Sequence, residues 1–287
     1  MLVEEKWTTV KILNWTKDFL LAKGVANARL EAEWLLCAAT GLDRMGLYLQ
    51  HDKPLNDCEL ASYRGMVARR ARREPLQHIL GSQEFYGLDF TVTPDVLIPR
   101  ADTEVLVAEA IKRGHNATTI LDIGTGSGGV AITLKKLLAS AVVTATDISA
   151  SALVVAGRNA VQHNVSIEFL LGSLLSPIAD RIFDIIVSNP PYIPTAAIET
   201  LDQEVRDYDP ISALDGGIDG LEIYRDLIPQ AIKNIKPGGW LLVEIGFGQS
   251  HDVFTLFKKC GGYQEPFIVS DQGGIDRVIG AQRKEIQ

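Results

Sequence analysis

The segment Val187–Ile193, VSNPPYI, places an amide side chain, two prolines and an aromatic ring directly after an apolar run. Proline has no N–H, fixes its own backbone angle and drives the residue before it into an extended conformation. Asn189, Pro190 and Pro191 therefore predict a stiff corner whose carbonyl oxygens are not committed to a strand ladder. Such a corner is either a simple strand stop or a set of hydrogen-bond acceptors for a bound group.

A second segment suited to chemistry is Leu121–Gly129, LDIGTGSGG, which also ends an apolar run. Its glycines let the backbone turn sharply and let a ligand approach the main chain, with the N–H groups of the next helix aimed at it. Gly124, Gly126 and Gly129 even satisfy the dinucleotide-binding spacing G-x-G-x-x-G. The spacing alone therefore leaves open a nicotinamide cofactor, a different cofactor or a plain tight turn.

An acidic residue, Asp147, ends the next apolar run, VVTATD. A carboxylate at this strand end can accept two hydrogen bonds from a ribose 2′,3′-diol, and it repels a 2′-phosphate. We therefore expect a cofactor with an unphosphorylated ribose, which disfavours NADP.

The composition limits the class of protein. With 287 residues the chain is long enough for two domains, and its net charge of −8 argues against a nucleic-acid backbone as the main partner. The cysteines, Cys37, Cys58 and Cys260, predict neither a disulfide framework nor a zinc site, and the five histidines follow no metal spacing. Because the sequence shows no signal peptide and no apolar run of membrane length, we expect a cytoplasmic protein without membrane or metal partners.

Residues 7–75 have a helical pattern of apolar positions. The two expected apolar faces are formed by Ile12, Trp15, Phe19 and Leu20, and by Leu30, Trp34, Cys37 and Ala38. A further helix is expected from Asn56, whose spacing to Glu59 resembles a capping box, to Pro75. Its arginines are either a solvated face near the helix C-terminus or a docking patch for an acidic partner or RNA; they are Arg64, Arg69, Arg70, Arg72 and Arg73.

From about residue 118 the pattern changes, because apolar runs of strand length alternate with helical segments. The seven expected strands are 118–124, 142–149, 166–173, 183–189, 238–246, 265–271 and 276–282. This alternation predicts an α/β fold with a mostly parallel, Rossmann-like sheet covered by helices on both faces. The short link QGGI between the last two strands requires an antiparallel pair. Residues 84–100 predict a hairpin linker before this sheet.

The acid before the glycines separates the cofactor alternatives. The pattern Asp122-x-Gly-x-Gly-x-Gly resembles the first motif of class I S-adenosylmethionine-dependent methyltransferases, whose strand pattern with an antiparallel last strand also matches residues 118–285. The resemblance implies S-adenosyl-L-methionine as cofactor, with Leu174 and a main-chain N–H beside the adenine. The implied cofactor-binding residues are Asp122, Gly124, Thr125, Gly126, Ser127, Gly128, Asp147, Leu174 and Asn189.

The corner Asn189-Pro190-Pro191-Tyr192 resembles the (Asp/Asn)-Pro-Pro-(Tyr/Phe) motif of methyltransferases that act on amino groups and amide nitrogens. A planar NH2 group is a poor nucleophile because its lone pair is delocalised. The Asn189 side chain and the Pro190 main chain can each accept one N–H, hold the nitrogen in line with the methyl group and stabilise the developing positive charge. We expect Asn189, Pro190 and Tyr192 to be catalytic, with Tyr192 stacked on the target and all four residues binding the substrate.

Three further stretches, 74–90, 96–107 and 205–228, resemble the release-factor glutamine methyltransferases of HemK/PrmC type. The resemblance implies methylation of the side-chain amide nitrogen, N(5), of the glutamine in the Gly-Gly-Gln motif of class 1 peptide-chain release factors. Two segments depart from the family pattern. Ile98–Glu104 reads IPRADTE where the family usually has IPRPETE, and Gly172–Leu175 lacks the acid and aromatic residue that many members carry there.

The resemblance also implies the domain organisation. A helical substrate-docking domain is expected at residues 1–75, a hairpin linker at 76–110 and the methyltransferase domain at 111–287. We expect a monomer with no nucleic-acid requirement.

Three alternatives stay open. A ribosomal-protein glutamine methyltransferase shares the Asn-Pro-Pro-Tyr corner but is less similar around Ile98. A nucleic-acid adenine methyltransferase shares the corner too, but it should carry a basic face or a target-recognition domain. A non-catalytic cofactor-binding module would transfer no methyl group at all.

Overall fold

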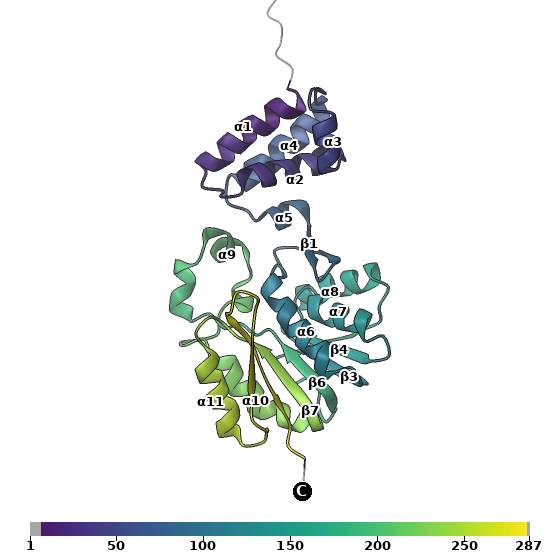
Figure 1. The fold of residues 1–287 in the computed structure, drawn as a ribbon, viewed down its shortest axis with the longest axis vertical. Helices are drawn as coiled ribbons and strands as arrows, with labels where there is room; N and C mark the ends of the chain where they lie inside the picture. Colours follow the sequence, from purple (N-terminus) through teal and green to yellow (C-terminus); the bar gives the residue numbers. More distant parts are fainter. Residues whose placement is uncertain (1–6, 286–287) are drawn as a thin grey trace, which may run out of the picture. The chain divides into compact units, whose positions relative to one another are not determined.

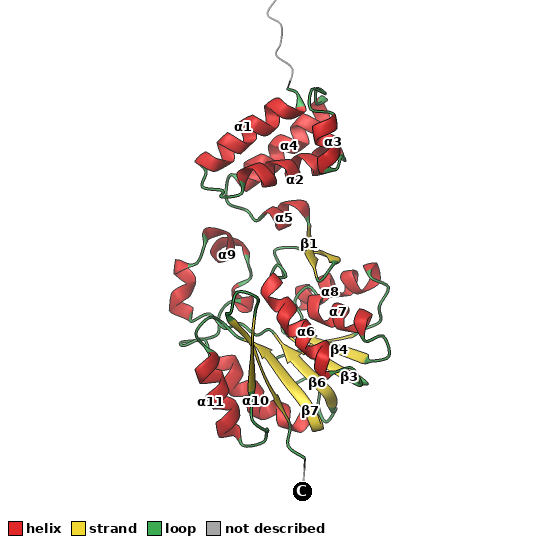
Figure 2. Cartoon of the chain, viewed as in Figure 1, coloured by secondary structure: helices red, strands yellow, loops and turns green. Residues whose placement is uncertain are grey.

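The fold is described from a computed structural model, which describes residues 7–285. The chain forms two compact units, residues 1–81 and residues 82–287. The division falls later than residue 75, because a short helix that follows Pro75 belongs to the first unit. Figure 1 labels most of the helices and several strands of both units, and Figure 2 distinguishes helices from strands by colour.

The first unit is a helical bundle. Its helices are α1 (Thr9–Ala22), α2 (Ala28–Thr40), α3 (Arg44–Leu49), α4 (Asp57–Arg70) and α5 (Leu76–Leu80). The longer helices α1, α2 and α4 pack against one another around an apolar core that includes Leu20, Leu35 and Tyr63. This unit therefore has a hydrophobic core of its own.

The predicted apolar faces of this bundle are partly wrong. Trp15 and Trp34 are 51% and 45% exposed, whereas the predicted Ile12 and Leu20 are buried. The buried apolar face of α2 is formed by Ala28, Ala32, Leu35 and Leu36. Small side chains at a contact allow helices to approach closely. The face of α2 that carries two alanines therefore packs against the other helices, and the face that carries Trp34 is exposed.

Helix α4 begins as predicted and ends earlier. Asn56 accepts a hydrogen bond from the Glu59 N–H, and the Glu59 carboxylate accepts one from the Asn56 N–H, which confirms the capping box. The helix ends at Arg70 rather than Pro75, because Arg73 has a positive φ of 69° and a residue before proline avoids the helical region. Arg70 pairs with Glu31 inside the bundle, so this arginine is not part of a solvated face.

The second unit is built on a seven-stranded sheet. Its strands are β3 (Thr119–Ile123), β4 (Val142–Asp147), β5 (Glu168–Leu171), β6 (Phe183–Ser188), β7 (Ile235–Glu244), β8 (Phe267–Ser270) and β9 (Asp276–Gln282). The strand order is β5-β4-β3-β6-β7-β9-β8, and β9 runs antiparallel to both of its neighbours. The predicted mixed sheet with an antiparallel last strand is therefore confirmed.

Helices cover both faces of this sheet, and Figure 2 shows α6 to α8 on one side and α10 with α11 on the other. The bounds of these helices are α6 (Glu104–Arg113), α7 (Gly129–Leu137), α8 (Ala150–Gln162), α10 (Glu222–Asn234) and α11 (Ser250–Cys260). Neighbouring strand residues point to opposite faces, so Ile120 and Leu121 enter different apolar cores. The sheet is thus a buried layer between two layers of helices.

The hairpin formed by β1 (Ser82–Phe85) and β2 (Leu88–Thr91) is packed onto this second unit. Phe85 and Phe90 are buried in the core beneath α6 and α7. The amide of Asn159 in α8 accepts from the Thr91 N–H at 2.8 Å and donates to the Thr91 carbonyl at 3.0 Å. The hairpin is therefore an ordered part of the second unit.

The remaining connections contain short helical segments, which are η1 (Ala101–Thr103), η2 (Thr195–Thr200), α9 (Gln203–Tyr208) and η3 (Ile211–Ala213). Within residues 7–285 no helix is both long and apolar enough to span a membrane.

Candidate active site

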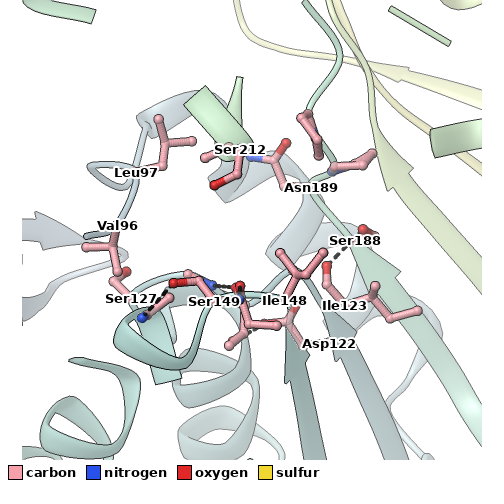
Figure 3. A pocket seen from close by; sticks show the side chains of 18 of the residues that line it. Val96, Leu97, Asp122, Ile123, Ser127, Ile148, Ser149, Ser188, Asn189 and Ser212 are labelled. Atoms are coloured by element: carbon pink, nitrogen blue, oxygen red, sulfur yellow. Dashed lines mark hydrogen bonds between the residues drawn. The ribbon is translucent and has the colours of Figure 1, made fainter. Parts of the chain in front are cut away.

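A cavity of about 270 Å³ lies at the carboxyl ends of β3, β4 and β6. The chain passes from β3 to β4 on one side and returns to β6 on the other, so the cavity occupies the topological switch point where such sheets bind ligands. The Ser188 hydroxyl donates to the Ile123 carbonyl at 2.9 Å and ties two of these strand ends together (Figure 3). Most of the residues predicted from the sequence line this cavity: Asp122, Gly124, Thr125, Gly126, Ser127, Asp147, Leu174, Asn189, Pro190 and Pro191.

The glycine loop turns the chain from β3 into α7. Gly124, Gly126 and Gly128 have φ values of 73°, 55° and 84°, a region that residues with a Cβ rarely adopt. A Cβ on Gly128 would also lie 2.8 Å from the Ile132 side chain. The loop therefore needs glycine both for its backbone conformation and for close packing, and the N-terminus of α7 follows at the cavity wall.

Asp122 stabilises the glycine loop. Its side chain is 1% exposed and accepts a hydrogen bond from the Thr125 hydroxyl at 2.7 Å. Burial raises the pKa of Asp122 to about 7, although hydrogen bonds from Thr125 and from the Ala131 backbone oppose this shift. The carboxyl group thus holds the loop in shape while it is shielded from water.

Asp147 ends β4 at the edge of the cavity, as the sequence predicts. One carboxylate oxygen accepts the Gly126 N–H at 2.8 Å, and the other accepts the Ser149 N–H at 2.9 Å. Each carboxylate oxygen can accept a second hydrogen bond. The side chain therefore joins the glycine loop to the start of α8 and retains two acceptor positions for a diol.

Leu174 lines the cavity, as do Ile148 and Ala152. It has a positive φ of 49°, and its carbonyl accepts a hydrogen bond from the Thr146 hydroxyl at 3.3 Å. This strained turn places an apolar side chain at the cavity, close to the end of β4.

The Asn189 side chain lies across the cavity from Ser127 and Ile148 (Figure 3). Its Nδ2 donates to the Thr103 hydroxyl oxygen at 3.0 Å, and among residues 7–285 no hydrogen bond ends on its Oδ1. Among residues 7–285 no hydrogen bond ends on the carbonyl oxygen of Pro190. Two acceptors of adjacent residues are therefore available at the end of β6.

Tyr192 is placed differently from these acceptors. It is absent from the cavity lining, and its ring packs against the apolar core on the α10 side of the sheet. Its hydroxyl lies 3.5 Å from Oε1 of the buried Glu244, and burial raises the pKa of this phenol above its usual range. Stacking of Tyr192 on a target group stays a prediction.

Several residues of the cavity wall were not assigned a role from the sequence. Arg100 binds the buried Asp209 at 2.8 Å, and Thr103, Ser212 and Asp215 line the cavity as well. They belong to the stretches 96–107 and 205–228, which carried the family resemblance. The family resemblance therefore pointed to these stretches of sequence. Only the folded chain shows that the two stretches meet at one cavity.

Solved structures with similar folds define the class. The chain resembles a methyltransferase from Pyrococcus furiosus with a TM-score of 0.55 and 21% identity, covering 76% of this chain and 99% of that one. It also resembles the Thermus thermophilus 16S rRNA N2 G1207 methyltransferase, solved with AdoMet and guanosine, with a TM-score of 0.51 and 17% identity over 71% and 50% of the chains. This fold, with a glycine loop at its switch point, is that of a class I methyltransferase.

Sequence comparisons narrow the class to one family. The chain is 55% identical to the release factor glutamine methyltransferase of Geobacter sulfurreducens over 97% of this chain and 98% of that protein. It is 44% identical to the protein of the same name from Moorella thermoacetica, over 93% and 95% of the two chains. The chain therefore belongs to the release factor glutamine methyltransferase family. In agreement, residues 11–81 match the PrmC N-terminal domain and residues 101–204 match the methyltransferase small domain.

Proposed function

We propose that this protein transfers a methyl group from S-adenosyl-L-methionine to N(5) of the glutamine in the Gly-Gly-Gln motif of class 1 peptide-chain release factors. The pair of free acceptors formed by Asn189 Oδ1 and the Pro190 carbonyl carries this proposal. Acceptors suit an NH2 donor and offer nothing to a carboxylate or thiolate. Membership of the release factor glutamine methyltransferase family supports a glutamine side chain as the source of that NH2 group.

The residues at the cavity fit this cofactor. Asp147 can accept the two ribose hydroxyls, Leu174 and Ile148 can hold the adenine, and the backbone of the glycine loop can face the remaining part of the molecule. When bound, S-adenosyl-L-methionine supplies a methyl group on a positively charged sulfur, which a nitrogen nucleophile can displace.

The chain itself positions and polarises the amide. Asn189 Oδ1 and the Pro190 carbonyl each accept one N–H, so the nitrogen lies in a fixed orientation with its reactive face toward the methyl group. Positive charge grows on the nitrogen during transfer, and the two acceptors therefore bind the transition state more tightly than the ground state. No strong base is needed, because a methylated and still protonated amide is very acidic and loses its proton to water.

The direct test is transfer of label from S-adenosyl-L-methionine to purified release factors, followed by peptide mapping. We expect the label on the glutamine of Gly-Gly-Gln. A Gln→Asn substrate, whose side chain is about 1.5 Å shorter, should take no label because its nitrogen cannot reach the acceptors and the methyl group together. Preferential methylation of a ribosomal protein or of an adenine would replace this proposal by one of the two alternatives.

We further propose that the helical unit docks the protein substrate. This unit has its own core, and its short helix α3 exposes three large side chains, Met45, Tyr48 and Leu49. Contacts remote from the glutamine can supply the binding energy that positions it. A short Gly-Gly-Gln peptide should therefore be a far poorer substrate than the whole release factor, and deletion of residues 1–81 should reduce activity on the factor much more than cofactor affinity.

A further inference from the structure

We infer that Thr103 and Glu244 are positioning residues that determine which end of the Asn189 amide faces the substrate. The inference rests on the proposed function, since it concerns the acceptor that would hold the substrate NH2 group. Neither residue was singled out by the sequence.

The side-chain amide of Asn189 contacts Thr103. A side-chain amide has donors at one end and an acceptor at the other, so donation from Nδ2 to the Thr103 oxygen at 3.0 Å directs Oδ1 away from Thr103. Thr103 is 6% exposed and ends the short η1 turn just before α6. Its hydroxyl oxygen is used as an acceptor here, so its own proton needs a different partner.

Glu244 offers an acceptor for the Thr103 proton. This residue ends β7 and is 1% exposed, and within residues 7–285 its Oε2 has no hydrogen-bond partner. The Thr103 hydroxyl lowers the pKa of Glu244, which is the effect of a hydroxyl proton directed at its carboxylate. A buried acceptor without a donor is costly. Thr103 has a proton to donate and Glu244 has an unused oxygen, so each supplies what the other lacks.

The protonation state of Glu244 sets the direction of the hydrogen bonds through Thr103 and Asn189. An ionised Glu244 can only accept, so the Thr103 proton points to it, the Thr103 oxygen accepts from Asn189 and Oδ1 is presented to the substrate. A neutral Glu244 can donate to Thr103 instead. The Thr103 proton would then be free to bind Oδ1, and a turned Asn189 amide would present its NH2 group to the substrate NH2 group. The charge of Glu244 therefore selects the productive orientation.

The charged and titratable groups around Glu244 come from four different elements. Asp102 lies on the η1 turn, Arg277 on β9, Tyr192 on the loop after β6 and Tyr224 on α10. Burial is the largest effect and raises the pKa of Glu244 to about 7. The Asp102 carboxylate acts in the same direction, whereas Thr103, Arg277 and Tyr192 oppose the shift. Arg277 is itself paired with Asp102 at 2.9 Å. The productive orientation should therefore become more populated as the pH rises through about 7.

Three variants test the inference in the full-length protein with a whole release factor at saturating S-adenosyl-L-methionine. Thr103→Val, which keeps the shape and removes the hydroxyl, should lower kcat by about tenfold or more with little change in cofactor affinity. Thr103→Ser, which keeps the hydroxyl, should retain most of kcat. Glu244→Gln should remove the rise of kcat between about pH 6 and pH 8 that the wild type shows, because the titrating group is gone. Asp122, whose pKa is also raised to about 7, is present in both the wild type and Glu244→Gln. A difference between their pH profiles of kcat therefore reports on Glu244.

A matched control is Thr133→Val in α7. Thr133 is also buried, and its hydroxyl has no hydrogen-bond partner among the described residues, so this change should leave kcat and its pH profile unaltered. The inference is overturned if the wild type methylates the release factor and Thr103→Val does so at the same rate. It is equally overturned if the valine and serine variants lose activity alike, or if Glu244→Gln keeps the wild-type pH profile. A wild type without activity on release factors would instead refute the proposed function.

Discussion

The side-chain amide of Gln249 donates to the carbonyl oxygen of Tyr192 at 2.9 Å. The same Nε2 contacts the Gly220 carbonyl at 3.2 Å, and the Gln249 Oε1 accepts the Gly246 N–H at 2.9 Å. One partly buried amide therefore joins the Asn-Pro-Pro-Tyr corner to two other loops at the same edge of the sheet. Gly220, with a φ of 75°, lies so close to the Tyr192 carbonyl that a Cβ there would overlap it.

Replacement of Gln249 by alanine should loosen this corner. Three hydrogen bonds are lost, at roughly 1 kcal/mol each before water replaces some of them, so we expect the free energy of unfolding to fall by about 1–3 kcal/mol. The turnover rate should fall as well, because the Pro190 carbonyl is two residues from the lost contact. Denaturant unfolding and kcat measure the two effects, and Gln272→Ala, at an exposed position, is the control. Wild-type stability and kcat in Gln249→Ala would show that the Asn-Pro-Pro-Tyr corner keeps its conformation without the Gln249 hydrogen bonds.

Replacement of Asp147 by alanine should weaken S-adenosyl-L-methionine binding by roughly 2–4 kcal/mol. Two charge-assisted hydrogen bonds of about 1.5–3 kcal/mol each are removed, with some compensation by water. The structure adds a second cause, because the same carboxylate orders the glycine loop through the Gly126 N–H. Titration calorimetry checks the affinity, with the exposed Asp180→Ala as control. Unchanged affinity in Asp147→Ala would rule out the ribose assignment.

Asp184 gives a prediction for the pH dependence of stability. One carboxylate oxygen accepts hydrogen bonds from the backbone N–H groups and hydroxyls of Thr118 and Thr119 at 2.8–2.9 Å, and the other pairs with Lys236 at 2.8 Å. Burial would raise the pKa of Asp184, but the contacts with Lys236, Thr118 and Thr119 lower it well below its usual range. A lowered pKa means that the charged carboxylate stabilises the fold above the unfolded-state pKa of about 4, and that this stabilisation disappears as the pH falls through the lower folded-state pKa.

Asp184→Asn should therefore be destabilised by roughly 1–3 kcal/mol at pH 7, because an amide nitrogen replaces an acceptor among donors. The difference from the wild type should shrink below about pH 4. Thermal unfolding of both proteins at a series of pH values measures it. A difference that is constant from pH 7 to pH 3 would contradict the charge-based explanation.

The features that the sequence predicts well are those with local signals. The strands around Asp122 and Asp147, the glycine loop and the Asn56–Glu59 capping box follow from apolar runs and from short spacings. Each is decided by residues within a few positions of one another, so the chain does not need to be folded for the pattern to be visible.

The features that were missed depend on contacts between distant segments. Trp34 has the same helical spacing as a buried residue, and only the packing against α1 and α4 shows that it lies outside the core. Thr103 and Glu244 are 141 residues apart in the chain, yet the fold brings Thr103 into contact with Asn189 and close enough to Glu244 to lower the pKa of that carboxyl group. Glu244 still gave one signal, since it is a lone acid in the apolar run WLLVEIG. A buried charge in such a run needs a functional or structural partner.

The Asn189 and Tyr192 side chains form a matched pair of tests for the reaction itself. Asn189→Ala removes the acceptor Oδ1 and leaves the backbone corner in place, so the fold should persist while kcat falls about a hundredfold or more, as for loss of one transition-state hydrogen bond. Tyr192→Phe removes only a hydroxyl whose contact with Glu244 is long, at 3.5 Å, and we expect a change in kcat of a fewfold at most. Single-turnover transfer to a release factor at saturating cofactor measures both, with thermal unfolding as a check on the fold. Normal turnover in Asn189→Ala would remove this side chain from the chemistry, and a loss in Tyr192→Phe as large as that in Asn189→Ala would assign the phenol a role beyond its ring.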